Sequence, residues 1–318
     1  MAKRRKIIIS VFFILILTIV FLAVFQKTKE NKTIEVFIPK GSSPYKISKI
    51  LKDSEIISSQ KVFLALIKIY GYSSKLKAGL YDFNTTDSLV SIINKIKNGE
   101  SKNIKITIPE GFNIKQIAQI LSDNNICNKD KFIELADNKQ MEGYLFPNTY
   151  FLFPQTPEQD IIKTMNDEFN KFWTKERKER LQQINKSLKN VLILASIVEK
   201  EAVADEERPI IAGVFLNRLA KGMKLESCST VLYAMGINKE RLSFEDLKID
   251  SPYNTYKYKG LPPGPICNPG AKAIDAVLYP KQTNSLYFVS KGNGTHYFSS
   301  TFEQHVRNKI ESKKKNKK

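Results

Sequence analysis

Two glutamates at the margin of an apolar helical pattern are the first candidates for chemistry in this sequence of 318 residues. Residues 192–202 read LILASIVEKEA. At about 100° per residue, Glu199 and Glu201 flank the apolar face of a helix on opposite sides, and Lys200 points away. That apolar face consists of Val191, Leu194, Ala195, Val198 and Ala202.

A carboxyl group in this position suits general acid catalysis, because partial burial raises the pKa of a carboxyl group toward the neutral range. Ser196 lies one helical turn before Glu199 and is placed to hold its carboxyl group. Periodicity does not choose between Glu199 and Glu201. Glutamates at a helix margin are also commonly part of the solvated surface, so that interpretation stays open here.

Polar side chains in two further segments are candidates for binding a substrate. Asn217 interrupts an otherwise apolar helical run. Tyr253, Asn254 and Thr255 come shortly before a Gly-Leu-Pro-Pro-Gly-Pro loop. Three prolines and two glycines in six residues fix the backbone of this loop, which is typical of a preorganised site.

Residues 141–154, MEGYLFPNTYFLFP, combine aromatic rings with one acidic side chain. Two prolines make the segment too irregular for a helix. Glu142 and Tyr144 would suit a sugar-binding cleft, because the faces of sugar rings stack on aromatic rings. An aromatic loop packed on the core is the alternative interpretation.

The remaining composition argues against cofactors, metals and nucleic acids. Two histidines and three cysteines show no metal-ligand spacing, and no GxGxxG loop precedes a helix. We therefore predict no cofactor and no metal site. The net charge of +19 includes a lysine-rich tail at residues 313–318, but no nucleic-acid-binding motif accompanies it. The tail is either simply solvated or attracted to an anionic surface.

An uncharged apolar run at residues 7–25 predicts a membrane anchor. Its nineteen residues are long enough for a helix that crosses a bilayer, and Lys3, Arg4, Arg5 and Lys6 precede it. A cleaved signal peptide is the alternative, but the run is long for one and no A-x-A site follows. We expect a single-pass protein of the cell membrane, with a cytoplasmic N-terminus and an extracytoplasmic body.

A repeat of 70 residues organises the first half of the chain. IPKGSSPYKISKILKDSEII begins at Ile38, and IPEGFNIKQIAQILSDNNI begins at Ile108. Each copy predicts a short strand, a Pro-x-Gly turn and an amphipathic helix, followed by a second apolar stretch. The first copy resembles a LysM-like glycan-binding module; two small units that only support each other are the alternative. A strand at 76–83 and a helix at 87–96 separate the copies.

The predicted fold class is α+β: an N-terminal transmembrane helix, small LysM-like βα subdomains, then a mixed α+β catalytic domain. We place a cytoplasmic tail at 1–6, the anchor at 7–25 and the LysM-like, membrane-proximal subdomain at 26–103. The catalytic domain spans 104–310 and includes the second βα unit, and a basic tail spans 311–318. Within the catalytic domain, residues 286–299 predict a β-hairpin around a Lys-Gly-Asn-Gly turn.

Five ordered segments resemble the YceG-like family, whose members are endolytic murein transglycosylases. They are EGYLFPNTY, LASIVEKEA, VFLNRLAKGMKL, the SPYNTY–GLPPGPI–NPG run, and YFVSKGNGTHYF. The resemblance covers most of residues 26–309 and is strongest from Glu142 onward. Each segment alone is weak, but their order and spacing together are specific. The layout of one transmembrane helix and a LysM-like subdomain also resembles the family.

The resemblance assigns roles to individual positions. The catalytic glutamate of the family corresponds to Glu199, which resolves the choice that the helical wheel left open. Substrate-binding or orienting roles are implied for Glu142, Tyr144, Ser196, Asn217, Thr230, Tyr253, Asn254 and Thr255. One departure is visible, because family members often have T-D-P-T where this chain has Ser-Cys-Ser-Thr at 227–230.

The activity implied by the resemblance is non-hydrolytic cleavage of the bond between N-acetylmuramic acid and N-acetylglucosamine. One carboxyl group would serve as general acid and base, leaving 1,6-anhydro ends. The implied partners are peptidoglycan glycan strands, the cell-wall synthesis machinery and the membrane, and the implied role is to terminate nascent strands. A hydrolytic muramidase and a non-catalytic glycan-binding scaffold are the alternatives.

The cysteines allow two interpretations outside the cytoplasm, where thiols oxidise. Cys228 and Cys267 both fall in segments assigned to the cleft, so one hypothesis pairs them in a disulfide that braces the proline-rich loop. The other leaves Cys127, Cys228 and Cys267 as free thiols.

Overall fold

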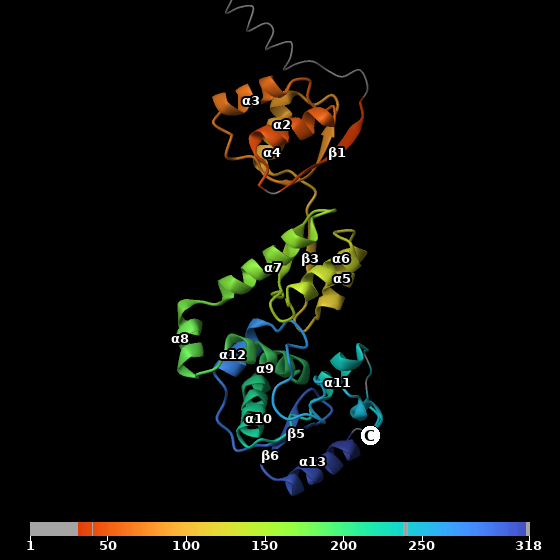
Figure 1. The fold of residues 1–318 in the computed structure, drawn as a ribbon, viewed down its shortest axis with the longest axis vertical. Coiled ribbons are helices and arrows are strands. Elements are labelled where there is room, and N and C mark those ends of the chain that lie inside the picture. The colour runs from red at the N-terminus through yellow and green to blue at the C-terminus, as the bar shows by residue number, and fades with distance from the viewer. Residues whose placement is uncertain (1–30, 40, 238, 240, 316–318) are drawn as a thin grey trace, which may run out of the picture. The chain divides into compact units, whose positions relative to one another are not determined.

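A computed structural model describes residues 31–39, 41–237, 239 and 241–315. It divides into two compact units: residues up to 104 together with 151–154, and residues 105–150 together with 155–318. The described residues form a mixed α+β fold with two-stranded sheets (Figure 1). The predicted transmembrane run at 7–25 lies outside them, and no helix among them is long and apolar enough to cross a bilayer.

The first unit packs three helices with one antiparallel strand pair. Its elements are β1 (Thr33–Ile38), α2 (Pro44–Asp53), α3 (Gln60–Ile69), β2 (Gly79–Asn84) and α4 (Leu89–Asn98). The register runs from Thr33 opposite Asn84 to Ile38 opposite Gly79. Each helix begins at a serine whose hydroxyl accepts a backbone N–H bond from the first turn, which stabilises that helix end. The predicted strand and helix between the repeats are thus confirmed.

The second copy of the repeat has the same order of elements. They are β3 (Ile104–Thr107), α5 (Ile114–Asp123), α6 (Lys129–Asn138) and β4 (Thr149–Leu152). Helices α2 and α5 lie 70 residues apart at both ends, and β4 begins 70 residues after β2. The repeat therefore extends one strand further than the sequence suggested, because each copy closes with a strand that pairs with its first strand.

The rest of the second unit surrounds one buried helix. Its elements are α7 (Glu158–Phe172), α8 (Lys175–Gln183), α9 (Leu188–Glu201), η1 (Asp205–Glu207), α10 (Arg208–Ala220), α11 (Cys228–Met235), η2 (Asp246–Lys248), α12 (Ala271–Leu278), β5 (Tyr287–Ser290), β6 (His296–Ser299) and α13 (Phe302–Lys315). Figure 1 shows α9 beside α10 and α12, and these three helices share one hydrophobic core. All eight residues from Val191 to Val198 are buried, so α9 is buried around its circumference up to Glu199, not along one face only.

Two local expectations can be compared with the described residues of this unit. The predicted hairpin is confirmed, with Tyr287 opposite Ser299 and Ser290 opposite His296. The polar helical region at 157–188 is divided into α7 and α8 by a break at Trp173, whose ring is buried in the core beside α9.

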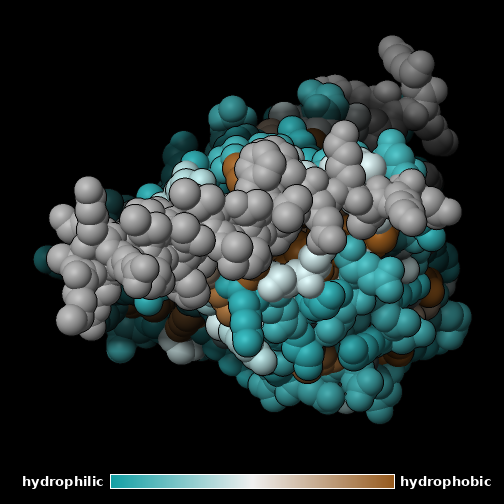
Figure 2. Space-filling view, turned by 90° about the horizontal axis from the view of Figure 1, so that it is seen from above, coloured by the Kyte–Doolittle hydropathy of each residue, from teal (hydrophilic) through white to brown (hydrophobic). Residues whose placement is uncertain are grey.

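The face seen in Figure 2 is largely hydrophilic, with hydrophobic residues exposed in scattered places.

Replacing Ile197 with alanine tests whether the α9 core holds the second unit together. Ile197 is fully buried, so Ile197→Ala should lower the free energy of unfolding by about 2–5 kcal/mol. Trp173, the chain's single tryptophan, lies in the same core, and its fluorescence during denaturant unfolding reports on this unit. Val203→Ala, at a residue 75% exposed, is the control and should change stability by less than about 0.5 kcal/mol. Equal unfolding midpoints for the two variants would contradict this packing.

Candidate active site

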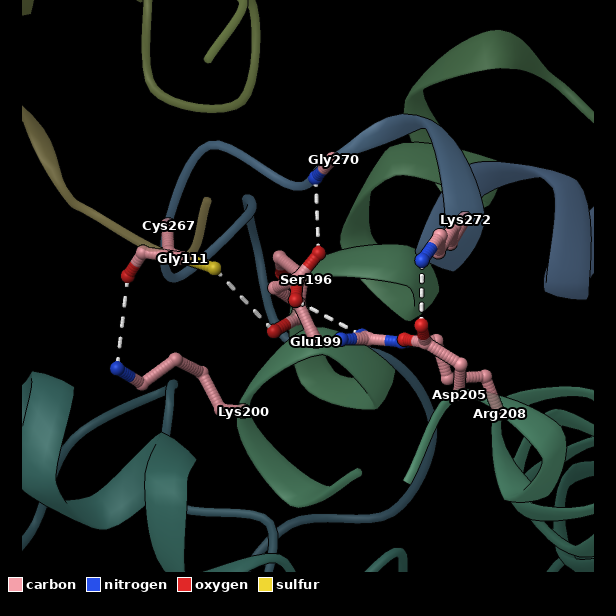
Figure 3. A network of polar contacts seen from close by, with 9 residues as sticks. All are labelled: Gly111, Ser196, Glu199, Lys200, Asp205, Arg208, Cys267, Gly270 and Lys272. Carbon is pink, nitrogen blue, oxygen red and sulfur yellow. Dashed lines mark hydrogen bonds and ion pairs between the residues drawn. The ribbon is translucent and has the colours of Figure 1, made fainter. Parts of the chain in front are cut away.

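Glu199 lies in the last turn of α9 with its carboxylate held by two donors. The Arg208 guanidinium donates to Oε1 at 2.8 Å, and the Gly270 backbone N–H donates to Oε2 at 2.8 Å (Figure 3). Its side chain is 5% exposed. Both donors stabilise a carboxylate, and the guanidinium contact is charge-assisted. Glu199 is therefore a largely desolvated, firmly oriented carboxylate.

Arg208 is fixed in turn by neighbouring charges. It is the first residue of α10, and its Nε donates to Asp205 Oδ1 at 3.0 Å. Lys272, in α12, forms an ion pair with the other Asp205 oxygen (Figure 3). This chain of ion pairs orients Arg208 toward Glu199.

Ser196 holds the loop before α12 and not the carboxyl group of Glu199. Its hydroxyl donates to Ile193 O at 2.7 Å and accepts from Ile266 N–H at 3.0 Å. The Cys267 thiol donates to Ser196 O at 3.3 Å. Ser196 is fully buried and its hydroxyl bonds to the backbone instead of the Glu199 carboxyl, while its substrate contact stays a prediction.

Asn268 joins three segments that are distant in sequence. Its Oδ1 accepts from the backbone N–H groups of Gly143 and Leu145, each at 2.9 Å. Its Nδ2 donates to Phe112 O at 3.0 Å and to Glu142 Oε1 at 2.9 Å. The side chain is fully buried and uses its full set of hydrogen bonds, so the aromatic segment is tied to the loop that holds Glu199.

Glu142 lines a cavity of about 690 Å³. Its Oε2 accepts from Ile114 N–H at 3.2 Å and from the Tyr233 hydroxyl at 3.4 Å. Burial raises the pKa of Glu142 to about 8, although these hydrogen bonds oppose the shift. Glu142 is therefore largely protonated at neutral pH. The rings of Tyr233 and Tyr253 line the same cavity, 4.9 Å apart between centroids. Glu199 is not among the lining residues.

The predicted substrate-binding residues separate into two groups. Glu142, Tyr144 and Tyr253 come together around the cavity. The others make hydrogen bonds within the fold: Ser196, Asn217, Thr230, Asn254 and Thr255.

This second group supports loops instead of facing the cavity. Asn217 donates to the carbonyls of Thr283 and Ser285, and Asn254 donates to those of Leu247 and Ile249. Asn254 is fully buried. Its amide closes its own loop, so the polar side chain serves the backbone.

The Thr230 and Thr255 hydroxyls meet at 2.9 Å in the same interior, and both side chains are buried. Thr255 Oγ1 also accepts from Ser227 N–H at 3.1 Å. These contacts fix the start of α11 on the loop at 253–255. The substrate contacts implied for Thr230 and Thr255 stay predictions, and the contacts shown are within the fold.

Residues 227–230, Ser-Cys-Ser-Thr, are where this chain departs from the T-D-P-T pattern. Two of their hydroxyls bind the second glutamate of α9. Glu201 Oε1 accepts from Ser227 Oγ at 2.6 Å and from Ser229 Oγ at 3.1 Å. The disulfide hypothesis is wrong for this structure, because all three cysteines are free. Cys228 is exposed and contacts the Tyr256 hydroxyl at 3.2 Å, whereas Cys267 is buried against α9.

Sequence reasoning missed Glu110, which lies beside the Glu199 contact. A Cβ atom on Gly270 would lie 1.9 Å from Glu110 Oε1, so the Glu110 carboxyl group rests against this glycine and would have to move aside for a larger residue. Burial and the charge of Glu199 raise the pKa of Glu110, while Arg208 and Lys272 oppose the shift. The signal for it in the sequence is the acidic residue of IPEGF, at the start of the second copy of the repeat. No group of three or more His, Cys, Asp or Glu side chains among the described residues is placed to hold a metal ion.

Comparisons with known proteins agree on one family. The model described as the YceG-like family matches residues 36–311. A Bacillus subtilis (strain 168) protein named endolytic murein transglycosylase is 38% identical over 305 residues, which cover 87% of this chain and 84% of that protein. One of the same name from Streptococcus pneumoniae serotype 2 is 31% identical, over 88% of this chain and 58% of that protein. The crystal structure of a YceG-like protein from Listeria monocytogenes has 34% identity and a TM-score of 0.61, over 87% of this chain and 99% of that one.

The raised pKa of Glu142 predicts a pH-dependent stability. Between about pH 4.5, the ordinary value, and about 8, the folded chain holds a proton that the unfolded chain releases. Stability should therefore fall as pH rises through this range, by about 2–4 kcal/mol. Glu142→Gln should remove most of this slope, measured by Trp173 fluorescence during denaturant unfolding at both ends of the range.

The control for this slope is Glu134→Gln, because Glu134 is an exposed glutamate in α6. It should leave the pH dependence of unfolding as in the parent chain. A slope that is the same in the Glu142 variant and the parent would show that Glu142 is ionised in the folded protein.

Proposed function

Because this chain belongs to the YceG-like family and is a lytic transglycosylase that acts on peptidoglycan, we propose that it cleaves internal bonds of glycan strands with Glu199 as its catalytic carboxyl group. The bond is the β-1,4 linkage between N-acetylmuramic acid and N-acetylglucosamine. The observation that carries this proposal is the placement of Glu199: desolvated, oriented by Arg208 and Gly270, and next to a second carboxyl group.

The reaction requires two proton transfers and no water. A carboxylic acid protonates the glycosidic oxygen as the bond from C1 of the muramic residue breaks. A carboxylate removes the proton from the C6 hydroxyl of the same residue, and the C6 oxygen bonds to C1 to give the 1,6-anhydro end. Because the substrate supplies its own nucleophile, a single carboxyl group is able to perform both transfers in turn.

The cavity beside Glu142 is the proposed site for a neighbouring sugar. Tyr144, Tyr233 and Tyr253 supply ring faces and hydroxyls, which suits a sugar ring with its substituents. A protonated Glu142 donates a hydrogen bond and does not repel the carboxylates that a muramic residue and its peptide carry. Asn268 joins this cavity to the loop that holds Glu199. A sugar bound in the cavity would therefore fix the position of the reacting bond relative to Glu199.

We assign the chain to the cell membrane, with residues 7–25 as its anchor and the body outside the cytoplasm. The proposed biological role is to terminate nascent glycan strands beside the wall-synthesis machinery. This role follows from the location of an anchored enzyme at the surface where new strands emerge.

Product analysis separates the transglycosylase from its two rivals. Full-length protein in detergent, incubated with purified uncrosslinked glycan strands, should release fragments with anhydro-muramic ends. Such fragments are lighter by one water than hydrolytic products, so mass spectrometry distinguishes them. Glu199→Gln should lower the rate by at least about 100-fold, because a carboxamide transfers no proton.

The matched control is Glu201→Gln, in the same helix, where the carboxyl group also accepts two hydrogen bonds. It should retain activity within about tenfold of the parent. Anhydro ends produced equally by the parent and Glu199→Gln would exclude Glu199 as the catalytic group. Hydrolytic ends would identify a muramidase, and strand binding without fragments would favour a scaffold.

The anchor is tested by alkaline extraction of membranes. The full-length chain should remain in the membrane pellet, because removing an apolar helix from a bilayer is costly. A chain that lacks residues 1–25 should move to the supernatant. Release of the full-length chain into the supernatant would contradict the anchor.

A further inference from the structure

We propose that Glu110 is a second catalytic carboxyl group, which donates the proton to the glycosidic oxygen while Glu199 takes the proton from the C6 hydroxyl. The proposal rests on the transglycosylase function above and divides its two proton transfers between two side chains. It is carried by the position, exposure and different partners of the two carboxyl groups.

Glu110 belongs to a turn that is fixed against the end of α9. The next residue, Gly111, donates its N–H to Asn268 O at 3.0 Å, and its carbonyl accepts from Lys200 Nζ at 3.4 Å (Figure 3). A Cβ atom on Gly111 would lie 3.4 Å from Glu199 Cγ. The backbone after Glu110 therefore packs directly on the Glu199 side chain.

Both carboxyl groups lie next to Gly270. Its N–H donates to Glu199 Oε2 at 2.8 Å, while Glu110 Oε1 occupies the space that a Gly270 side chain would fill. One glycine thus separates the oxygens of two acidic side chains. This arrangement places both carboxyl groups within reach of a single sugar residue.

The two carboxyl groups differ in access. Glu110 is an exposed residue, whereas the Glu199 side chain is 5% exposed. A glycosidic oxygen between two bulky sugars is more easily reached by the exposed group. The C6 hydroxyl is a small substituent on a flexible arm, which is able to reach the recessed one.

They also differ in the partners that hold them. The Glu199 carboxyl accepts hydrogen bonds from the Arg208 guanidinium and the Gly270 N–H. Among the described residues, none donates a hydrogen bond to the Glu110 carboxyl or forms an ion pair with it. Although the residue is exposed overall, partial desolvation of its carboxyl group and the Glu199 charge raise the pKa of Glu110; Asp205 adds to the shift, and the cations Arg208 and Lys272 oppose it. Adjacent carboxyl groups with different environments are the usual arrangement of an acid and a base.

The resulting step is balanced. The Glu110 proton passes to the glycosidic oxygen, the bond from C1 to that oxygen breaks, and its electron pair stays on the leaving oxygen. The C6 oxygen bonds to C1 and gives its proton to Glu199. Glu199 then returns a proton to Glu110 through water, which restores both groups for the next turnover.

The test uses a substrate that needs no acid. In an aryl muramoside, the leaving group is a stable nitrophenolate. The bond between C1 and the leaving oxygen therefore breaks without protonation of that oxygen. Glu110→Gln, in the full-length protein, should lose at least about 100-fold on glycan strands but stay within about tenfold of the parent on the aryl muramoside. Glu199→Gln should lose activity on both substrates, because both need a base for the C6 hydroxyl.

A second measurement is the pH dependence of kcat/KM on strands. In the parent, activity should fall on the alkaline side as Glu110 loses its proton, and this limb should be absent from the residual activity of Glu110→Gln. The control is Glu206→Gln, an exposed carboxyl group in η1 next to the same ion-pair chain, which should keep both the rate and the limb.

Three outcomes would overturn the proposal. They are full activity of Glu110→Gln on strands, equal losses on strands and on the aryl muramoside, and an alkaline limb that survives the substitution. Equal losses would identify Glu110 as a positioning residue. Failure of the function itself is distinguishable, because the parent protein would then leave no anhydro ends on strands.

Discussion

The site depends on one short loop, Cys267–Gly270, whose backbone and side chains hold the acidic groups in place. Asn268 saturates its amide with four hydrogen bonds and so ties this loop to Glu142 and to the aromatic segment. Two residues later, Gly270 donates to Glu199 and leaves room for Glu110. A larger side chain at 270 would disturb Glu199 and Glu110 at once, and a lost amide at 268 would remove a hydrogen bond to Glu142.

The energetics of Glu199 explain why the surrounding helices are packed so closely. Removing a carboxylate and a guanidinium from water costs several kcal/mol for each ion, and an ion pair offsets this only when its geometry and remaining hydrogen bonds are good. Arg208 meets that condition with Glu199 on one side and Asp205 on the other. The buried core of α9, α10 and α12 supplies the rigidity, since it fixes the two helix ends from which Glu199 and Arg208 extend.

Local patterns in the sequence were enough to predict several parts of the fold. The period of two in residues 286–299 predicted the hairpin, and the 70-residue repeat predicted two strand–helix units with matching helix bounds. The apolar pattern of α9 placed Glu199 at the edge of the core, where it is 5% exposed. These features follow from residues that are neighbours along the chain.

The remaining site could not be predicted because its contacts are distant in sequence. Gly270 and Glu110 reach Glu199 across long separations, and no local period records such a meeting. The direction of a side chain in a loop could not be predicted from the sequence either. Asn254 and Tyr253 are adjacent and both polar, yet the amide turns inward to close its own loop while the tyrosine lines the cavity.

With Glu199 and Glu110 both beside Gly270, we expect the reacting bond to lie at this glycine, between Glu110 and residue 199. The most direct measurement is the crystal structure of Glu199→Gln bound to an uncleaved glycan strand. In that complex, the glycosidic oxygen should lie within hydrogen-bond distance of Glu110, the muramic C6 hydroxyl beside residue 199, and a neighbouring sugar in the Glu142 cavity. A strand whose scissile bond lies in the Glu142 cavity, away from Gly270, would contradict it.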